Sequence, residues 1–242
     1  MKFFLDKLIS LILIIFFSPV FIIIPLIIFL YDFSNPFYTP YRIGMNNKKF
    51  KMIKFRSMVL NADKNSIDST KKDDQRITPI GKFIRKFKLD EISQLLNVLI
   101  GNMSLVGPRP NVEREVQMYS KEEMKILTVK PGITDFASIV FADEGDILFG
   151  SEDPDLKYNQ IIRPWKSRLA ILYVEKNNFL IDIYILFLTF FSFFKRKYTL
   201  SLLSKFINKV SDDKMLVDMC RREFSLKSMP PPGFNEIIKK RF

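Results

Sequence analysis

The chain has 242 residues, a formal net charge of +12 and a sequence pI of about 9.6. It has no histidine and one cysteine, which excludes a histidine general base, an internal disulfide and most zinc or iron sites. Any bound metal should therefore be a hard cation held by carboxylates, such as Mg²⁺. The length suits one domain with a real core, and the basic excess favours phosphate-rich ligands, anionic lipid or nucleic acid.

The N-terminal segment is apolar over residues 8–31 except for two serines, and this run is long enough to span a bilayer. Pro19 lies near its middle and removes one backbone donor, which Ser18 can compensate with its hydroxyl. Both flanks are basic, and positive charge prefers the cytoplasmic side of a membrane. We therefore predict a re-entrant hairpin over residues 1–34, broken at Ser18-Pro19. A straight transmembrane helix and a signal peptide are the alternatives.

Basic and apolar residues alternate over residues 48–58, which predicts a short strand with Lys54 and Arg56 on one face. A solvated basic face is the simpler alternative. Residues 61–75 are polar without an apolar period, and we expect a mobile loop over the site. Thr78-Pro79 then has the pattern of an N-cap followed by proline in the first helical position.

The next segment, residues 83–99, predicts an amphipathic helix with a break. One face carries a stripe that we expect to be buried, formed by Ile92, Leu95, Leu96 and Leu99. The opposite face carries Asp90, Gln94 and Asn97. Arg85 and Lys88 fall on the apolar side, so we predict that the helix restarts near Asp90. Asp is a good N-cap and helix N-termini attract phosphate, although an N-cap on an ordinary helix explains Asp90 equally well.

Two stiff basic turns follow. Pro108 and Pro110 enclose Arg109, and a fixed arginine suits bidentate phosphate binding, although a plain surface turn fits as well. Lys130 opens the second turn. The acidic residues between 143 and 155 are expected to form solvated surface.

The C-terminal third contains a second apolar run, residues 179–194, that is short for a span and contains Asp182. It predicts a core or interfacial helix. Lys195-Arg196-Lys197 follows and is expected to hold lipid headgroups. We expect an α+β, predominantly helical fold, with a cytoplasmic catalytic domain with interfacial helices over 35–198. Residues 199–242 are expected to form a basic amphipathic extension of unknown role.

Several of these segments occur in an order that resembles the monotopic phosphoglycosyl transferases, also called bacterial sugar transferases. The resemblance covers about residues 7–182 and rests on Ser18-Pro19 and on residues 54–58, 76–81, 85–99, 101–110 and 130–134. Each segment is a weak signal, whereas the ordered set is specific. The family's common proline three residues after the nucleophile is Ser93 here, and its common Gly-Trp-Ala-Gln is Asp135-Phe136-Ala137-Ser138. These departures bear on donor specificity.

The resemblance implies transfer of a sugar phosphate from a UDP-sugar to undecaprenyl phosphate at the cytoplasmic membrane face of a bacterium, with release of UMP. It implies Asp90 as the nucleophile on the β-phosphorus and Glu91 as the Mg²⁺ ligand. It also implies that Arg109, between Pro108 and Pro110, meets the nucleotide phosphates. Further substrate contacts are expected from Lys54, Arg56, Arg85, Gln94 and Lys130. Membrane lipid and a second copy of the chain are expected partners, and nucleic acid is not.

Two rival functions remain open at this point. A basic membrane-attached adaptor that binds anionic lipid or nucleic acid explains the charge, but it does not need Asp90-Glu91 beside Arg109, and no recognised nucleic-acid motif is present. An enzyme that degrades the lipid product is the other alternative, and the lack of histidine argues against many phosphatase mechanisms.

Overall fold

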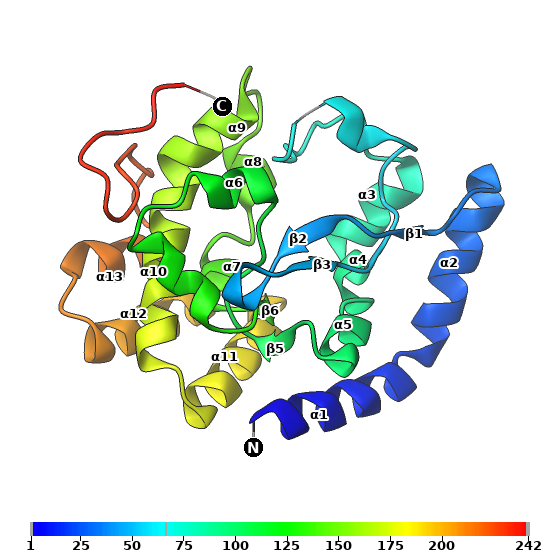
Figure 1. The fold of residues 1–242 in the computed structure, drawn as a ribbon, viewed down its shortest axis with the longest axis horizontal. Coiled ribbons are helices and arrows are strands. Elements are labelled where there is room, and N and C mark those ends of the chain that lie inside the picture. Colours follow the sequence, from blue (N-terminus) through cyan, green and yellow to red (C-terminus); the bar gives the residue numbers. More distant parts are fainter. Residues whose placement is uncertain (1, 66, 241–242) are drawn as a thin grey trace.

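The computed structural model describes residues 2–65 and 67–240. The described residues are predominantly helical with a few short strands, which confirms the predicted α+β class (Figure 1). The helices of eight or more residues are α1 (Lys2–Phe16), α2 (Ser18–Asp32), α3 (Pro79–Lys86), α10 (Arg163–Lys176), α11 (Phe179–Ser192), α12 (Arg196–Val210) and α13 (Lys214–Arg221). Shorter helices are α4 (Leu89–Ile92), α5 (Leu95–Ile100), α6 (Glu113–Gln117), α7 (Phe136–Val140), α8 (Glu144–Ile147) and α9 (Pro154–Lys157).

The remaining elements are single turns and short strands. The turns are η1 (Met45–Asn47), η2 (Ala62–Asn65), η3 (Glu123–Thr128) and η4 (Tyr158–Ile162). The strands are β1 (Phe37–Tyr38), β2 (Tyr41–Ile43), β3 (Lys49–Lys51), β4 (Lys54–Phe55), β5 (Ser104–Val106) and β6 (Gly132–Thr134). They form three two-stranded sheets, of which β1-β4 and β2-β3 are antiparallel and β5-β6 is parallel. The strand predicted over residues 48–58 is thus divided into β3 and β4.

The N-terminal hairpin consists of α1 and α2, which meet at Phe17 and are bent by 63°. Pro19 lies in the first turn of α2, where its missing N–H costs no helical hydrogen bond. The predicted break at Ser18-Pro19 is therefore confirmed. Among the described residues, no single helix is long and apolar enough to cross a membrane, but the bent pair has the necessary length and composition.

Polar contacts fasten each arm of this hairpin to the body of the molecule. In α1, the buried Ser10 hydroxyl donates to the carbonyl of Leu95 at 2.6 Å. At the end of α2, Asp32 accepts two hydrogen bonds from Arg56, at 2.5 and 2.6 Å. Figure 1 shows the hairpin along one side of the molecule, with α1 beside α5 and α2 outermost.

The main core includes both the middle and the C-terminal part of the chain. Phe136 from α7 and Leu169 from α10 pack in the same hydrophobic cluster as Leu203 from α12 and Cys220 from α13. All four side chains are almost completely buried. Residues 199–242 therefore contribute to the core, although the predicted domain boundaries themselves stay a prediction.

One predicted surface feature is wrong in detail. The acidic residues of 143–155 are not simply solvated, because Asp155 is buried and accepts the amide hydrogen of Ser69 at 2.7 Å. Asp143 pairs with Arg196 at 2.8 Å, whereas the lipid contact expected of Lys195-Arg196-Lys197 stays a prediction. Tertiary ion pairs thus organise charges that look like free surface in the sequence.

Candidate active site

The helix that carries Asp90 is interrupted, as the charge pattern predicts. Helix α3 is capped by the Thr78 hydroxyl, which accepts the amide hydrogen of Gly81 at 2.9 Å, and Pro79 takes the first helical position. The chain then turns at Lys88, whose φ of 52° lies in the left-handed region. The proposed N-cap role of Asp90 is wrong, because Lys88 is the N-cap and Asp90 is the second residue of α4.

The polar face after Asp90 packs inward together with part of the predicted apolar stripe. Gln94 and Asn97 are both 1% exposed and Leu95 is 5% exposed, whereas Leu96 and Leu99 are only half-buried. The reason is a backbone edge beside the helix: the Asn97 side chain accepts the amide hydrogen of Ile53 and donates to the carbonyl of Lys51, each at 2.8 Å. These bonds hold the segment leading to Lys54 against α5, the helix that follows the two carboxylates.

Glu91 lies at the centre of an ion-pair cluster. Its Oε1 accepts a short hydrogen bond from the Arg109 guanidinium and lies 3.6 Å from Nζ of Lys54. In the chain, Lys54 precedes α4 and α5 and lies in strand β4, whereas Arg109 follows them and lies in the turn after β5. The structure therefore brings together three of the side chains predicted for the site.

Two close backbone contacts hold Arg109 in place. Strand β5 pairs with β6, and the Gly107 amide donates to the carbonyl of Thr134 at 3.0 Å while the Gly132 amide donates to the carbonyl of Pro108 at 3.0 Å. A Cβ atom on Gly132 would lie 2.1 Å from the Gly107 nitrogen, so only glycine fits there. The two stiff turns predicted from the sequence are thus packed on one another, and together they position Arg109.

The two adjacent carboxyl groups have opposite pKa shifts. Burial raises the pKa of Asp90, and the charge of Lys54 only partly offsets it. Burial also acts to raise the pKa of Glu91, but the charges of Arg109 and Lys54 outweigh it and hold that pKa well below its usual range. The direction at Asp90 is opposite to the expected effect of a helix N-terminus and nearby cations, because the side chain is only 8% exposed.

Additional cations surround this pair. The charge of Arg85 acts on Asp90, and that of Lys88 acts on both carboxyl groups. Arg42, which sequence reasoning missed as a site residue, is near enough to Arg109 for the two charges to interact. Its position on β2 gives no periodic signal toward Asp90, so only the tertiary fold reveals it.

Three predicted substrate contacts lie in other surroundings. The Arg56 guanidinium is 7% exposed and is occupied by Asp32 and by the carbonyl of Asn35 at 2.8 Å, which favours an anchoring role for it. Nζ of Lys130 lies 4.1 Å from the centre of the Phe3 ring in α1. Gln94 is buried at the start of α5, and its Nε2 has no hydrogen-bond partner among the described residues.

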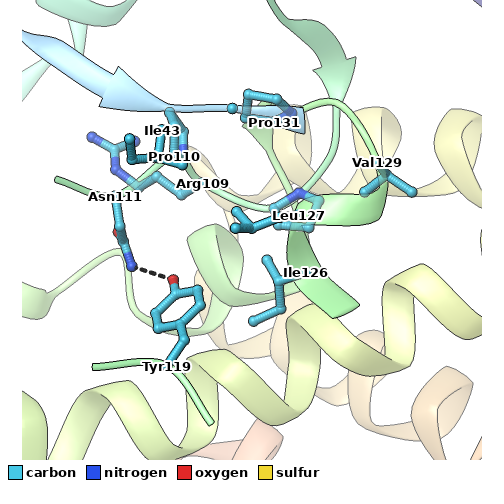
Figure 2. A pocket seen from close by; sticks show the side chains of 11 residues that line it. Ile43, Arg109, Pro110, Asn111, Tyr119, Ile126, Leu127, Val129 and Pro131 are labelled. Carbon is cyan, nitrogen blue, oxygen red and sulfur yellow. Dashed lines mark hydrogen bonds between the residues drawn. The ribbon is translucent and has the colours of Figure 1, made fainter. Parts of the chain in front are cut away.

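Two pockets adjoin the Pro-Arg-Pro turn. The smaller is bordered by Pro108, Arg109 and Pro110, and Figure 2 shows on its wall the hydrogen bond from Asn111 to the Tyr119 hydroxyl, 2.7 Å long. The larger encloses about 440 Å³, counting space open to solvent, and shares Pro108 and Arg109 with the first. Arg109 thus borders both the ion-pair cluster and this larger pocket.

Comparison with known proteins identifies this arrangement. The profile of the family described as "Bacterial sugar transferase" matches residues 1–196, which include the hairpin, the Asp90-Glu91 pair and Arg109. The chain belongs to the bacterial sugar transferase family. The resemblance drawn from the sequence is thereby confirmed.

Named relatives of this sugar transferase include exopolysaccharide proteins and undecaprenyl-phosphate transferases. The exopolysaccharide production protein ExoY of Sinorhizobium fredii is 38% identical over 144 residues, 53% of this chain and 64% of that protein. The UDP-glucose:undecaprenyl-phosphate glucose-1-phosphate transferase of Klebsiella pneumoniae is 33% identical over 196 residues, 79% of this chain. The uncharacterized sugar transferase EpsL of Bacillus subtilis is 36% identical over 156 residues, 64% of this chain and 68% of EpsL. The matched part of the sugar transferase spans under two thirds of ExoY and 40% of the Klebsiella protein.

The structure explains how this sugar transferase accommodates its two departures from the motif pattern. The Ser93 hydroxyl lies 3.0 Å from the carbonyl of Asp90 and 3.1 Å from that of Ile53, so it adds a polar link where the family commonly has proline. Asp135 caps α7 by accepting the amide hydrogen of Ser138 at 2.6 Å. Both replacements thus make local hydrogen bonds close to the site.

Proposed function

We propose that this sugar transferase moves a sugar 1-phosphate from a UDP-sugar to undecaprenyl phosphate and releases UMP. The observation that carries the proposal is the buried Asp90 beside Glu91, which is itself paired with Arg109 and Lys54. The printed names of the Klebsiella relative and of the undecaprenyl-phosphate galactose phosphotransferase of Salmonella typhimurium support this reaction class. The sugar itself is left open.

The balance of charge suits a diphosphate. Two carboxylates, Asp90 and Glu91, are accompanied by the cations Lys54, Arg109, Lys88, Arg85 and Arg42. Phosphoryl transfer depends on positioning and charge neutralisation more than on acid–base groups. The surplus positive charge would compensate the donor's phosphates, which otherwise repel an attacking carboxylate.

We infer a two-step reaction. A carboxylate oxygen of Asp90 attacks the β-phosphorus of the donor, the bond from this phosphorus to the bridging oxygen breaks, and UMP leaves with that oxygen. The sugar phosphate is now joined to Asp90 as an acyl phosphate. A phosphate oxygen of the lipid acceptor then attacks the same phosphorus and releases the Asp90 carboxylate, giving the polyprenyl-diphospho-sugar.

The donor set is compatible with magnesium. The described residues contain no group of three or more His, Cys, Asp or Glu side chains that could hold a metal ion. Mg²⁺ is, however, commonly held by one or two carboxylates together with substrate phosphates. The pKa of Glu91 lies well below its usual range, so its carboxylate is ionised and suited to this role. Bound there with the diphosphate, Mg²⁺ would neutralise charge on the leaving UMP.

We also propose that the hairpin is re-entrant and lies in the cytoplasmic face of the membrane. Apolar side chains are exposed along α1, α2 and α11, among them Phe4, Phe16, Ile22, Leu26, Leu180 and Phe190. Nζ of Lys88 lies 5.9 Å from the centre of the Phe193 ring, just after α11, so the site adjoins this apolar surface. A lipid acceptor would present its phosphate at that level.

The test is UMP release from a panel of UDP-sugars in membranes supplied with undecaprenyl phosphate. We expect release with at least one donor and almost none from Asp90→Asn, which keeps the side-chain shape and removes the nucleophile. A matched control is Asp146→Asn, which changes an exposed carboxylate paired with Lys72. Equal activity in wild type and Asp90→Asn would contradict the proposal.

A further inference from the structure

The larger pocket beside Arg109 has a lining that the proposed mechanism does not use. It is bordered by Pro108 and Arg109 on the side of the ion-pair cluster and by Arg163 and Ser167 of α10 elsewhere. It is a shallow hollow that opens to solvent, and most of its space of about 440 Å³ is shared with the solvent outside. A donor whose diphosphate contacts Arg109 would therefore extend a neighbouring part into this pocket.

Asp135 is the acidic residue that lines this pocket, and only one of its carboxylate oxygens has hydrogen-bond partners among the described residues. The residue is 2% exposed, and its Oδ1 accepts both the amide and the hydroxyl of Ser138, at 2.6 and 2.7 Å. No hydrogen bond from the residues that the structure describes reaches its Oδ2, and it forms no ion pair with them. Oδ2 is therefore free to accept a hydrogen bond from a ligand in the pocket.

The other charges of the pocket are already paired. Arg163 binds Glu123, with its NH2 nitrogen 2.7 Å from Oε2, and the Lys166 ammonium binds Glu144. No surplus of cations remains there for another phosphate. A carboxylate with neighbouring hydroxyl and amide groups suits the vicinal hydroxyls of a sugar ring, as an acidic side chain does when it binds a ribose.

We propose that this pocket binds a hydroxylated ring of the donor, with Asp135 accepting hydrogen bonds from two of its hydroxyl groups. This inference rests on the proposed function and adds a specificity-determining residue to it. Two rings of a UDP-sugar have this chemistry, the pyranose of the transferred sugar and the ribose of the nucleotide. The experiment separates them.

The test compares Asp135→Asn with Asp153→Asn. The first variant keeps an oxygen that accepts the Ser138 amide and replaces the other oxygen by a donor. The second changes an aspartate that caps α9 in the same way, accepting the Leu156 amide at 2.9 Å, and that does not line the pocket. We expect Asp135→Asn to raise KM for the UDP-sugar by about 10- to 100-fold, as expected for a lost hydrogen bond to a charged group, and Asp153→Asn to leave it unchanged.

Inhibition by UMP identifies the ring. An unchanged inhibition constant in Asp135→Asn assigns the pocket to the pyranose, and a constant raised in step with KM assigns it to the ribose. Should Asp135→Asn fail to fold, Asp135→Ser keeps a capping hydroxyl, removes the carboxylate and should raise KM equally. If the wild-type protein is active and either variant has a KM within about threefold of the wild-type value, the assignment of this pocket is wrong, whereas the proposed function still stands. Wild-type protein that releases no UMP would instead overturn the proposed function and the inference with it.

Discussion

Arg163, which lines the larger pocket, forms an ion pair with Glu123 that is shielded from solvent, and breaking this pair should strongly destabilise the fold. The side chains of Arg163 and Glu123 are 1% and 0% exposed. Arg163 donates to both Glu123 oxygens, at 3.0 and 2.7 Å, and also to Asn159 at 3.1 Å and to the carbonyl of Met118 at 2.8 Å. Arg163→Gln leaves Glu123 as a buried charge, for which the usual loss is about 3–5 kcal/mol.

That loss is a large part of an ordinary unfolding free energy of about 5–15 kcal/mol. It is measured by urea unfolding in detergent, followed by the emission of Trp165, the single tryptophan, which lies buried in α10. The control is Lys72→Gln, because the Lys72–Asp146 pair is 66% and 57% exposed and such pairs contribute about 0–1 kcal/mol.

Removing both charges separates lost packing from an unpaired charge. The double variant Arg163→Met, Glu123→Gln should lose less stability than Arg163→Gln alone, because no isolated charge remains buried. A loss below about 1 kcal/mol for Arg163→Gln, equal to that of the exposed control, would refute the reasoning.

Three further predictions concern the site and the hairpin. Burial raises the pKa of Asp90, so the acid limb of the pH–rate profile should lie above the ordinary aspartate pKa of 3.8. Lys54→Gln removes a positive charge that lowers this pKa and should therefore move the acid limb to higher pH. An acid limb that stays in place or moves to lower pH in this variant would contradict the proposed interaction between Lys54 and Asp90. EDTA should abolish turnover and Glu91→Gln should raise the Mg²⁺ concentration required, whereas full activity in EDTA would remove the metal assignment. Cysteines placed at positions 2 and 48, with Cys220 replaced, should both be labelled from the cytoplasmic side. Pro19→Ala should favour a straight helix that moves position 2 across the membrane. A periplasmic position 2 in the hairpin that keeps Pro19 would refute the re-entrant topology.

The sequence predicted correctly those helix starts and breaks that depend on neighbouring residues in the chain. Thr78-Pro79 starts a helix because a hydroxyl cap and a proline fit the first turn of any helix, and the structure has both. The bend at Ser18-Pro19 and the break before Asp90 were predicted for similar reasons. The N-cap predicted at Asp90 lies two residues earlier, at Lys88. Lys88 turns the chain in the left-handed conformation, and the preference of Asp for helix N-termini does not predict this turn.

Long-range pairings could not be predicted from the sequence. Arg56 and Lys54 alternate on one segment, yet one binds Asp32 in the hairpin and the other faces Glu91. The helical wheel placed Leu95 in the core correctly, but it did not predict that the polar face is buried as well, because Asn97 pairs with a backbone edge more than forty residues earlier in the chain. These outcomes depend on which segments meet in three dimensions.

Trapping the covalent bond between Asp90 and the sugar phosphate distinguishes the two-step reaction from direct attack by the lipid phosphate. Wild-type protein is incubated with a UDP-sugar labelled in the sugar, without lipid acceptor, and is then analysed by mass spectrometry of its peptides. The account predicts a sugar-phosphate adduct on the peptide containing Asp90, its absence in Asp90→Asn, and its loss when undecaprenyl phosphate is added. Turnover in Asp90→Asn within about tenfold of wild type, equivalent to a barrier change of about 1.4 kcal/mol, would contradict the account and favour direct attack by the lipid phosphate.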